Sequence, residues 1–373
     1  MRYFFSSGEA SGELSAVLLA DAIANVDPDA QFEGIGAERM RERGFTLWRN
    51  NTGWASMGPI AALPRIPKLL NTMWQTARHI TDDKPDLVVL VDFGVFNMRL
   101  AKELRSKYDY QGPIMDLFPP ATWLDKEKVA RAVASWTVPV TAFAHQYEFY
   151  KSHRLPIMFF GHPLAGQYVT REARPAPAKE GGTIALLPGS RGTELRYHVP
   201  ALIAAVKKLR ERRPLLNAIF GAANDESERT IARAVKSAKL GNVRIVRGIG
   251  EAVKDADAAF VASGTAVLET TLLGVPAVAL YIIAPYLVRH ARKVYSGKYI
   301  TLPNLVLKRE LIPELLQSDA TPERLADTMD KLLDDPSVQY RYIPEVRAAL
   351  GSPTALDDCA RFAVALAKAG QRT

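Results

Sequence analysis

The chain has 373 residues, of which 48% are hydrophobic and 24% charged, and its formal net charge is +8. This length fits two domains of ordinary size, and the composition is typical of globular proteins and excludes long disorder. The longest apolar runs have the length of strands, so we expect no transmembrane helix. The N-terminus reaches polar turn residues too early for a signal peptide, so we expect a cytoplasmic protein.

Charge, cysteine and histidine content limit the partners and the chemistry. The positive charge favours anionic partners such as nucleotides or an acidic membrane surface, whereas the scattered basic residues argue against nucleic acid. The single cysteine, Cys359, excludes an internal disulfide, and the six histidines lack the spacing of metal ligands. We therefore expect neither a bound metal nor a cofactor.

Short apolar strands, glycine-containing turns and amphipathic helices alternate along the chain, which predicts parallel sheets covered on both faces. In the first half, strands are expected at residues 2–6, 31–34, 87–92, 113–117, 137–143 and 157–160, and helices at 11–25 and 98–107. In the second half, strands are expected at residues 183–187, 217–220, 243–246, 258–262 and 277–281, and helices at 322–333 and 343–369.

This alternation predicts an α/β protein with two Rossmann-like, doubly wound domains and a cleft between them. The first domain is expected at residues 1–170 and the second at 183–340, joined at 171–182 by a loop rich in proline, glycine and charge. Residues 341–373 are expected to form a helical segment that packs either on the first domain or on a partner subunit in a homodimer.

Two strand-to-helix turns in the second half are candidates for a phosphate site. In the first, backbone N–H groups near Gly189, the hydroxyl of Ser190 and the guanidinium of Arg191 suit an anion. The second turn offers the N–H and hydroxyl donors of Ser263, Gly264 and Thr265, followed by Glu269, which could accept from ribose hydroxyls. Ordinary turns with capping residues are the alternative for both. Asn304, in a loop shaped by proline, is a further candidate.

In the first half, two places carry candidate chemistry. The stretch Gly8-Glu-Ala-Ser-Gly-Glu13 follows the first strand, and its glutamates would suit sugar hydroxyls, although Ser11 and Glu13 could simply cap the helix. Asp92 ends an apolar strand and is a plausible general base; the alternative is a cap for the next helix. Residues 54–74 are apolar and broken by proline, which predicts either a core helix or a lip for an acyl chain or a membrane.

Taken together, these motifs resemble the lipid-A-disaccharide synthase family of glycosyltransferases, which have the GT-B fold. The matching segments run through most of the chain in order. They are Gly8-Glu-Ala-Ser-Gly-Glu13, Gly34-Ile-Gly36 with Met40, Ser56-Met-Gly58, Val91-Asp92 with Phe96-Asn97, Phe149-Tyr150, Phe160-Gly-His-Pro163, Leu186-Leu-Pro-Gly-Ser-Arg191, Ala262-Ser-Gly-Thr-Ala266 with Leu268-Glu269, Leu273-Gly-Val-Pro276, Tyr299 with Leu302-Pro-Asn-Leu305, and Pro313-Glu-Leu-Leu-Gln317.

The resemblance implies transfer of a diacylated glucosamine from UDP to the 6-hydroxyl of a diacylglucosamine 1-phosphate, with inversion and release of UDP, on the inner face of the cytoplasmic membrane. Asp92 would be the base and Arg191 would stabilise the leaving diphosphate. The UDP-sugar would lie on the two turns and Asn304, without a metal. The acceptor contacts implied are Gly8, Glu9, Ser11, Gly12 and Met57.

The chain departs from the family in the half expected to bind the acceptor. The family's Asp-Ala-Pro-Asp-Phe-Asn reads Asp92-Phe-Gly-Val-Phe-Asn97, its Ser-Pro-Ser-Val-Trp-Ala-Trp reads Phe118-Pro-Pro-Ala-Thr-Trp-Leu124, and Glu13 replaces an aspartate. Two alternatives follow: a related UDP-sugar transferase with another acceptor, and a homologue that binds nucleotide without catalysis.

Overall fold

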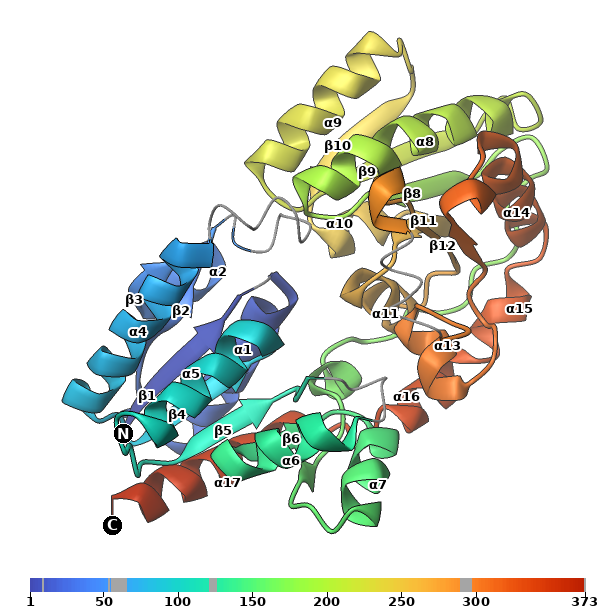
Figure 1. The fold of residues 1–373 in the computed structure, drawn as a ribbon. Coiled ribbons are helices and arrows are strands. Elements are labelled where there is room, and N and C mark those ends of the chain that lie inside the picture. Colours follow the sequence, from blue (N-terminus) through green and yellow to red (C-terminus); the bar gives the residue numbers. More distant parts are fainter. Residues whose placement is uncertain (9, 53, 55–65, 121–125, 289–296, 372–373) are drawn as a thin grey trace. The chain divides into compact units, whose positions relative to one another are not determined.

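The structure, a computed structural model, describes all residues except 9, 53, 55–65, 121–125, 289–296 and 372–373. It divides into two compact units, Met1–Gln167 with Leu350–Thr373, and Tyr168–Ala349. Each unit is a parallel sheet with helices on both faces (Figure 1). The expected α/β class with two Rossmann-like domains is confirmed.

The first unit holds seven parallel strands in the order β3-β2-β1-β4-β5-β6-β7. The strands are β1 (Arg2–Ser7), β2 (Gln31–Gly36), β3 (Thr46–Asn50), β4 (Leu87–Val91), β5 (Ile114–Leu117), β6 (Val138–Thr141) and β7 (Met158–Phe159). The helices are α1 (Ala10–Val26), α2 (Glu38–Glu42), α4 (Ile66–Asp83), α5 (Gly94–Ser106), α6 (Glu127–Trp136), α7 (Ala144–Ser152), the 3-10 helix η2 (Pro163–Gly166) and α17 (Ala355–Gly370).

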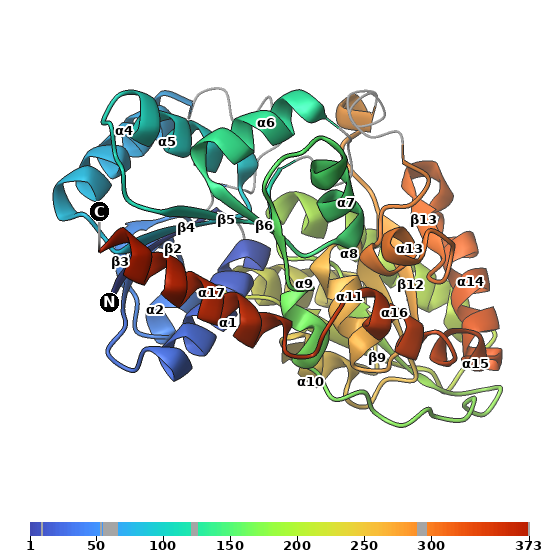
Figure 2. The same ribbon diagram turned by 90° about the horizontal axis from the view of Figure 1, so that it is seen from below.

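Alternate residues of the strands fill two cores, as the pleat requires. Tyr3 and Phe5 of β1 face a core shared with α1 and α17, whereas Phe4 faces one shared with α4 and α5. Figure 2 shows α17 lying along α1, and the two helices are in contact. The C-terminal helix of the chain therefore completes the first unit.

The second unit holds six parallel strands in the order β10-β9-β8-β11-β12-β13. The strands are β8 (Thr183–Leu187), β9 (Asn217–Ala222), β10 (Val243–Arg247), β11 (Ala258–Ala262), β12 (Ala277–Tyr281) and β13 (Glu314–Leu316). The helices are α8 (Gly192–Arg210), α9 (Asp225–Ser237), α10 (Ile249–Val253), α11 (Thr265–Leu272), α13 (Leu302–Leu307), the 3-10 helix η3 (Gln317–Asp319), α14 (Pro322–Asp334), α15 (Ser337–Tyr340) and α16 (Ile343–Ala349).

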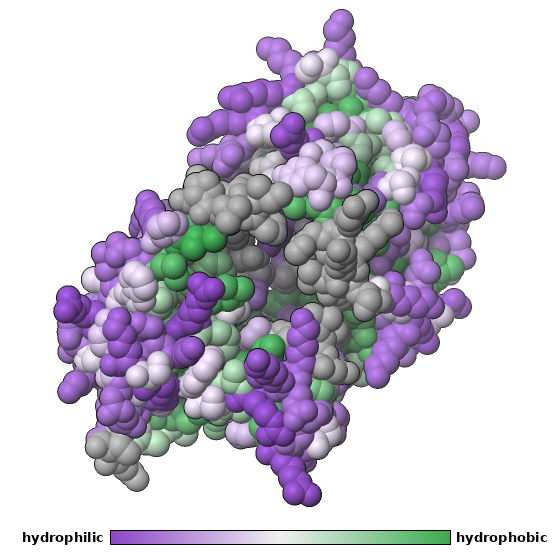
Figure 3. All heavy atoms as spheres, in the orientation of Figure 1, coloured by the Kyte–Doolittle hydropathy of each residue, from purple (hydrophilic) through white to green (hydrophobic). Residues whose placement is uncertain are grey.

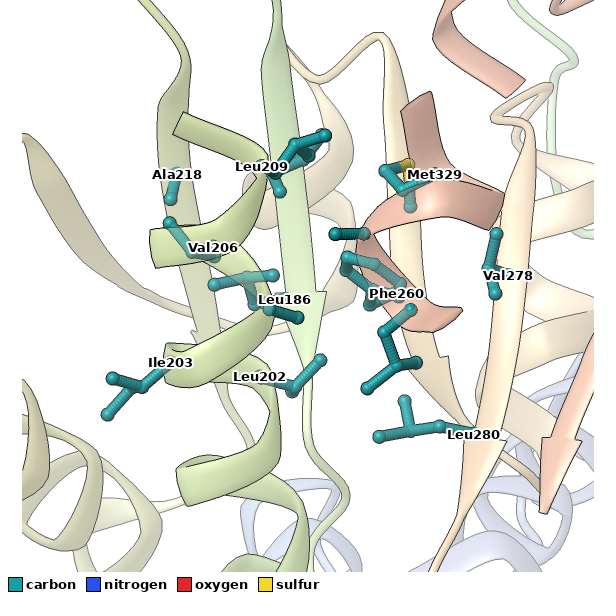
Figure 4. Packing of buried hydrophobic residues seen from close by; sticks show 14 of the residues in the cluster. Leu186, Leu202, Ile203, Val206, Leu209, Ala218, Phe260, Val278, Leu280 and Met329 are labelled. Atoms are coloured by element: carbon teal, nitrogen blue, oxygen red, sulfur yellow. The ribbon is translucent and has the colours of Figure 1, made fainter. Parts of the chain in front are cut away.

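One core of the second unit lies between the sheet and helices α8 and α14. Figure 4 shows Leu186 and Phe260 of the sheet packed with Val206 of α8 and Met329 of α14, and all four are fully buried. The segment expected to link the domains runs along this unit, because Arg171 donates to the carbonyl oxygens of Gly274 and Val253 at 3.1 and 3.2 Å.

Figure 3 shows hydrophilic side chains over most of the face in view. Among the described residues, the helices are all too short or too polar to cross a membrane. Nor do three histidine, cysteine, aspartate or glutamate side chains gather in this described part as a metal site would require.

Candidate active site

The strand order of each sheet reverses at one point, between β1 and β4 in the first unit and between β8 and β11 in the second. Ligands of doubly wound sheets bind beyond the carboxyl ends of the strands at such a switch point. Gly8–Glu13, Asp92, Gly189–Arg191 and Ser263–Thr265 directly follow these four strands, whereas the candidate Asn304 lies further along the chain in α13. Apart from Asn304, these candidate segments of each unit therefore lie at its own switch point.

The turn between β8 and α8 is built on Gly189. Its φ is +101°, which favours glycine, and an added Cβ would lie 2.2 Å from Oε2 of Glu194, so a side chain there would strain the backbone and displace the glutamate. The N–H groups of Ser190 and Arg191 donate to this Oε2 at 3.1 and 3.2 Å, and Nη1 of Arg191 donates to Oε1 at 3.1 Å. The Glu194 carboxylate thus binds N–H donors that we expected to face a phosphate.

Glu194 holds the turn in one conformation by accepting the N–H groups of Ser190 and Arg191. The N–H groups that can meet a ligand are therefore those of the next two residues along the chain. The glutamate is 7% exposed, whereas Gly192 and Thr193 are exposed. These two residues begin α8, where backbone N–H groups have no intrahelical carbonyl. The side chain of Arg191 is 36% exposed although it pairs with Glu194. An anion at this turn would meet the start of α8 and the guanidinium.

The second turn, between β11 and α11, lies beside the first. Strands β8 and β11 pair directly, with Leu187 opposite Val261, so both turns leave the same edge of the sheet. Gly264 has a φ of +148°, and a Cβ there would meet open space. Ser263 and Thr265 flank it and are half-buried.

Glu269, one turn into α11, accepts a hydrogen bond from the hydroxyl of Tyr168. This contact joins Oε2 of the glutamate to the phenol oxygen at 2.9 Å. Tyr168 begins the segment that leads into the second unit. The carboxylate expected to accept from ribose hydroxyls therefore already has a protein donor on one oxygen.

Asn304 organises a loop from within. Its side chain is fully buried: Nδ2 donates to Ile312 O and Glu314 Oε1, and Oδ1 accepts the N–H groups of Leu311 and Ile312, all at 2.7–2.9 Å. Glu314 also accepts the N–H groups of Ile300 and Thr301. The asparagine thus holds residues 300–314 together and exposes no polar atom at its surface.

In the first unit, Asp92 follows β4 in a left-handed backbone conformation that Phe93 shares, each with a φ of +53°. Such a conformation costs a non-glycine residue about 1–3 kcal/mol and is typical of functional sites. Asn97, which is buried, supports it by donating to the carbonyl oxygen of Asp92 at 2.7 Å and accepting from the hydroxyl of Ser6 at 2.7 Å.

The N-cap position of the following helix is not Asp92. Helix α5 begins at Gly94, earlier than expected, and its N-cap residue is Phe93 without a side-chain cap. Oδ1 of Asp92 accepts the N–H of the adjacent Phe93 at 2.9 Å, which is not a donor within the helix. Asp92 is half-buried at the switch point of the sheet.

The glycines after β1 let this turn approach α1. A Cβ on Gly8 would lie 2.0 Å from the ring of Phe93, and one on Gly12 would lie 3.2 Å from the carbonyl oxygen of Val91. Ser11 lies in the first turn of α1, so it is not the cap considered as an alternative. Glu13 instead accepts the N–H groups of Ala37 and Met40 at the start of α2. Two further expected acceptor contacts, Glu9 and Met57, lie outside the described residues.

Asp116 is a buried acid that the sequence patterns did not single out. It lies in β5 opposite Leu90 of β4, is 1% exposed, and its Oδ2 has no hydrogen-bond partner in the described part of the chain. Burial, reinforced by the charge of Asp92, raises the pKa of Asp116 to about 8. At neutral pH the carboxyl is protonated, so Asp92 has a neutral neighbour. The sequence signal that could have identified Asp116 is a single acidic residue within an apolar strand.

An aromatic and aliphatic surface adjoins Asp92. The ring centroids of Trp54, Phe93 and Phe96 lie 5.4–6.2 Å apart. Val95 is 76% exposed in the first turn of α5. Apolar groups therefore flank the candidate base.

A family model described as lipid-A-disaccharide synthetase matches residues 3–348, which span both units. The chain belongs to the lipid-A-disaccharide synthase family. The lipid-A-disaccharide synthase of Hahella chejuensis is 34% identical over 340 residues, covering 88% of this chain and 84% of the relative. That of Saccharophagus degradans is 31% identical over 354 residues, covering 91% and 90%. The expected family is confirmed, and the protein is a glycosyltransferase.

Solved structures share the fold at low identity. The UDP-GlcNAc 2-epimerase of Neisseria meningitidis bound to UDP-GlcNAc is 12% identical, with a TM-score of 0.62 over 97% of this chain and 99% of that chain. MurG of Acinetobacter baumannii is 15% identical, with a TM-score of 0.57 over 97% and 98%. These likenesses show that this lipid-A-disaccharide synthase family member has the GT-B fold.

Proposed function

We propose that this protein transfers a 2,3-diacylglucosamine unit from UDP to the 6-hydroxyl of 2,3-diacylglucosamine 1-phosphate. The β-1,6-linked lipid A disaccharide forms with inversion, and UDP leaves. Family membership supports the reaction, and the observation that carries the mechanism is Asp92, held in a strained turn at the switch point of the first sheet. The first unit supplies the base, and the second supplies the donors for the nucleotide.

Asp92 removes the proton of the acceptor hydroxyl as the oxygen of that hydroxyl attacks the anomeric carbon of the donor. An ionised carboxylate is required for this step. Since Asp116 holds its own proton at neutral pH, Asp92 can carry the negative charge without a second charge beside it. The fixed turn orients the base before the acceptor binds, which lowers the entropic part of the barrier.

The leaving diphosphate gains negative charge as the bond between the anomeric carbon and its oxygen breaks. Arg191 and the first N–H groups of α8, at Gly192 and Thr193, stabilise that charge, while Glu194 keeps the turn in shape. The second turn, Ser263–Thr265, holds the rest of the UDP with Glu269. Asn304 acts through the loop that it organises and makes no direct contact with the ligand.

Both substrates carry acyl chains, so we further propose that the protein acts at the inner face of the cytoplasmic membrane. The net charge of +8 favours an anionic lipid surface, and the apolar groups around Phe93 and Val95 suit acylated sugars. Association as a homodimer remains a prediction, which light scattering on the purified protein tests directly.

Release of UDP from the UDP-diacylglucosamine donor, measured with and without the acceptor, tests this proposal. We expect release to depend on the diacylglucosamine 1-phosphate. If UDP is released only with another acceptor, acylated or not, that acceptor would replace the diacylglucosamine 1-phosphate assigned here. Binding of UDP without any release in the presence of the acceptor would indicate a nucleotide-binding homologue without catalysis.

A further inference from the structure

His198 lies in α8 one turn beyond Glu194 and is fully buried. Residues at positions i and i+4 share one face of a helix, so both side chains reach back toward the turn that precedes α8. Nδ1 of His198 lies 2.7 Å from the carbonyl oxygen of Pro188, and Nε2 lies 3.0 Å from the backbone nitrogen of Ile282. The imidazole therefore links Pro188, which precedes Gly189, to Ile282, which follows β12.

The two partners of His198 leave its ring only one protonation state. A carbonyl oxygen only accepts, so Nδ1 carries the hydrogen; the N–H of Ile282 only donates, so Nε2 carries a lone pair. A second proton, on Nε2, would point an N–H of the ring at the N–H of Ile282 inside the core. Burial also lowers the pKa of His198, which keeps the imidazole neutral at pH 7.

The bridge spans a strand that leads into the second candidate turn. Strand β11 lies between β8 and β12, and the N–H of Ser263 at its end donates to the carbonyl oxygen of Leu280 at 3.1 Å. The carbonyl of Pro188 shares a planar peptide unit with the N–H of Gly189, so its direction sets the entry to the first turn. The ring of His198 therefore connects the segments on which both turns stand.

We propose that His198 is a positioning residue that fixes the Pro188–Arg191 turn relative to the ends of β11 and β12. It holds the two turns at the spacing required by a nucleoside diphosphate. The inference rests on the proposed function, which places UDP on these turns. Glu194 shapes the first turn internally, whereas His198 ties that turn to the rest of the sheet.

Calorimetric titration with UDP tests this role in the wild type, in His198→Leu and in His198→Asn. Leucine removes both hydrogen bonds, and we expect UDP to bind it about tenfold more weakly. Asparagine keeps a donor near the position of Nδ1 and should recover part of the affinity. Leu209→Ala is the matched control, since Leu209 is a buried residue at the other end of the same helix, α8 (Figure 4). It should lower the melting temperature without changing UDP affinity.

Equal UDP affinity in the wild type and His198→Leu would overturn the proposal, and so would an equal loss in Leu209→Ala. If the wild type itself does not bind UDP, the nucleotide site of the proposed function fails, and the positioning role fails with it. Nitrogen NMR of ¹⁵N-histidine-labelled wild type tests the bridge without any variant or nucleotide. A neutral ring protonated on Nδ1 at pH 7 is expected, and protonation on Nε2 would overturn the bridge.

Discussion

Replacing Asp116 with asparagine should stabilise the first unit at neutral pH. The carboxyl is 1% exposed and burial raises its pKa to about 8, whereas an aspartate in the unfolded chain ionises near pH 4. Between these values the folded protein holds a proton that the unfolded chain releases. The free energy of unfolding therefore falls as the pH rises from about 4 to about 8.

The size of this effect follows from how far burial raises the pKa of Asp116. A tenfold change in an ionisation equilibrium corresponds to about 1.4 kcal/mol, so keeping this carboxyl protonated in the folded state costs on the order of 4 kcal/mol at pH 7. Asparagine has a similar shape and no charge, but it buries an amide whose hydrogens need partners, which costs about 1–3 kcal/mol. We expect a net gain of about 1–3 kcal/mol at pH 7 and a net loss of about 1–3 kcal/mol at pH 4, where holding the proton in the wild type costs almost nothing.

Denaturant unfolding of both proteins at pH 4, 5, 6, 7 and 8 measures this gain. The difference between Asp116→Asn and the wild type should grow with pH up to about 8. The control is Asp82→Asn: Asp82 is exposed on α4, and an exposed carboxylate is solvated in both states, so this change should not alter the pH dependence. A constant difference across the series, or a variant less stable at pH 8 than the wild type, would refute the reasoning.

Three further predictions concern the site. Asp92→Asn should lower the turnover number about 100- to 10,000-fold in a UDP-release assay, with UDP affinity retained; unchanged turnover would remove Asp92 as the base. Arg191→Ala should weaken UDP binding by about 1.5–3 kcal/mol in calorimetry, whereas the exposed Arg196→Ala should not. Gly189→Ala should cost about 1 kcal/mol or more in thermal unfolding and weaken UDP binding, because Cβ would strike Glu194; Gly250→Ala, with open space around it, is its control.

Much of the fold could be predicted from the sequence, because most strands are apolar runs bounded by turn residues. Strands β8, β11 and β12 begin and end at the expected residues. Strands β3 and β13 were not predicted; they lie at the edges of their sheets, and nearly all of their residues are half-buried or exposed. Without a continuous apolar run, such strands are defined by pairing with a neighbour.

The candidate site was predictable where it depends on local sequence. The glycine turns at Gly189 and Gly264 and the strand end at Asp92 lie at the switch points of the two sheets. Contacts between distant segments were not predictable in the same way. Glu314 is ten residues from Asn304 in sequence, and the hydrogen bond between their side chains decides that Asn304 is internal.

The central claim is that the protein forms the lipid A disaccharide, and mass spectrometry of the product tests it most directly. Purified wild type is incubated with UDP-2,3-diacylglucosamine and 2,3-diacylglucosamine 1-phosphate, beside Asp92→Asn. The wild type should produce the tetra-acylated disaccharide phosphate and one UDP per disaccharide, and the variant only traces. Absence of the disaccharide from the wild-type reaction, with both substrates intact, would contradict the account.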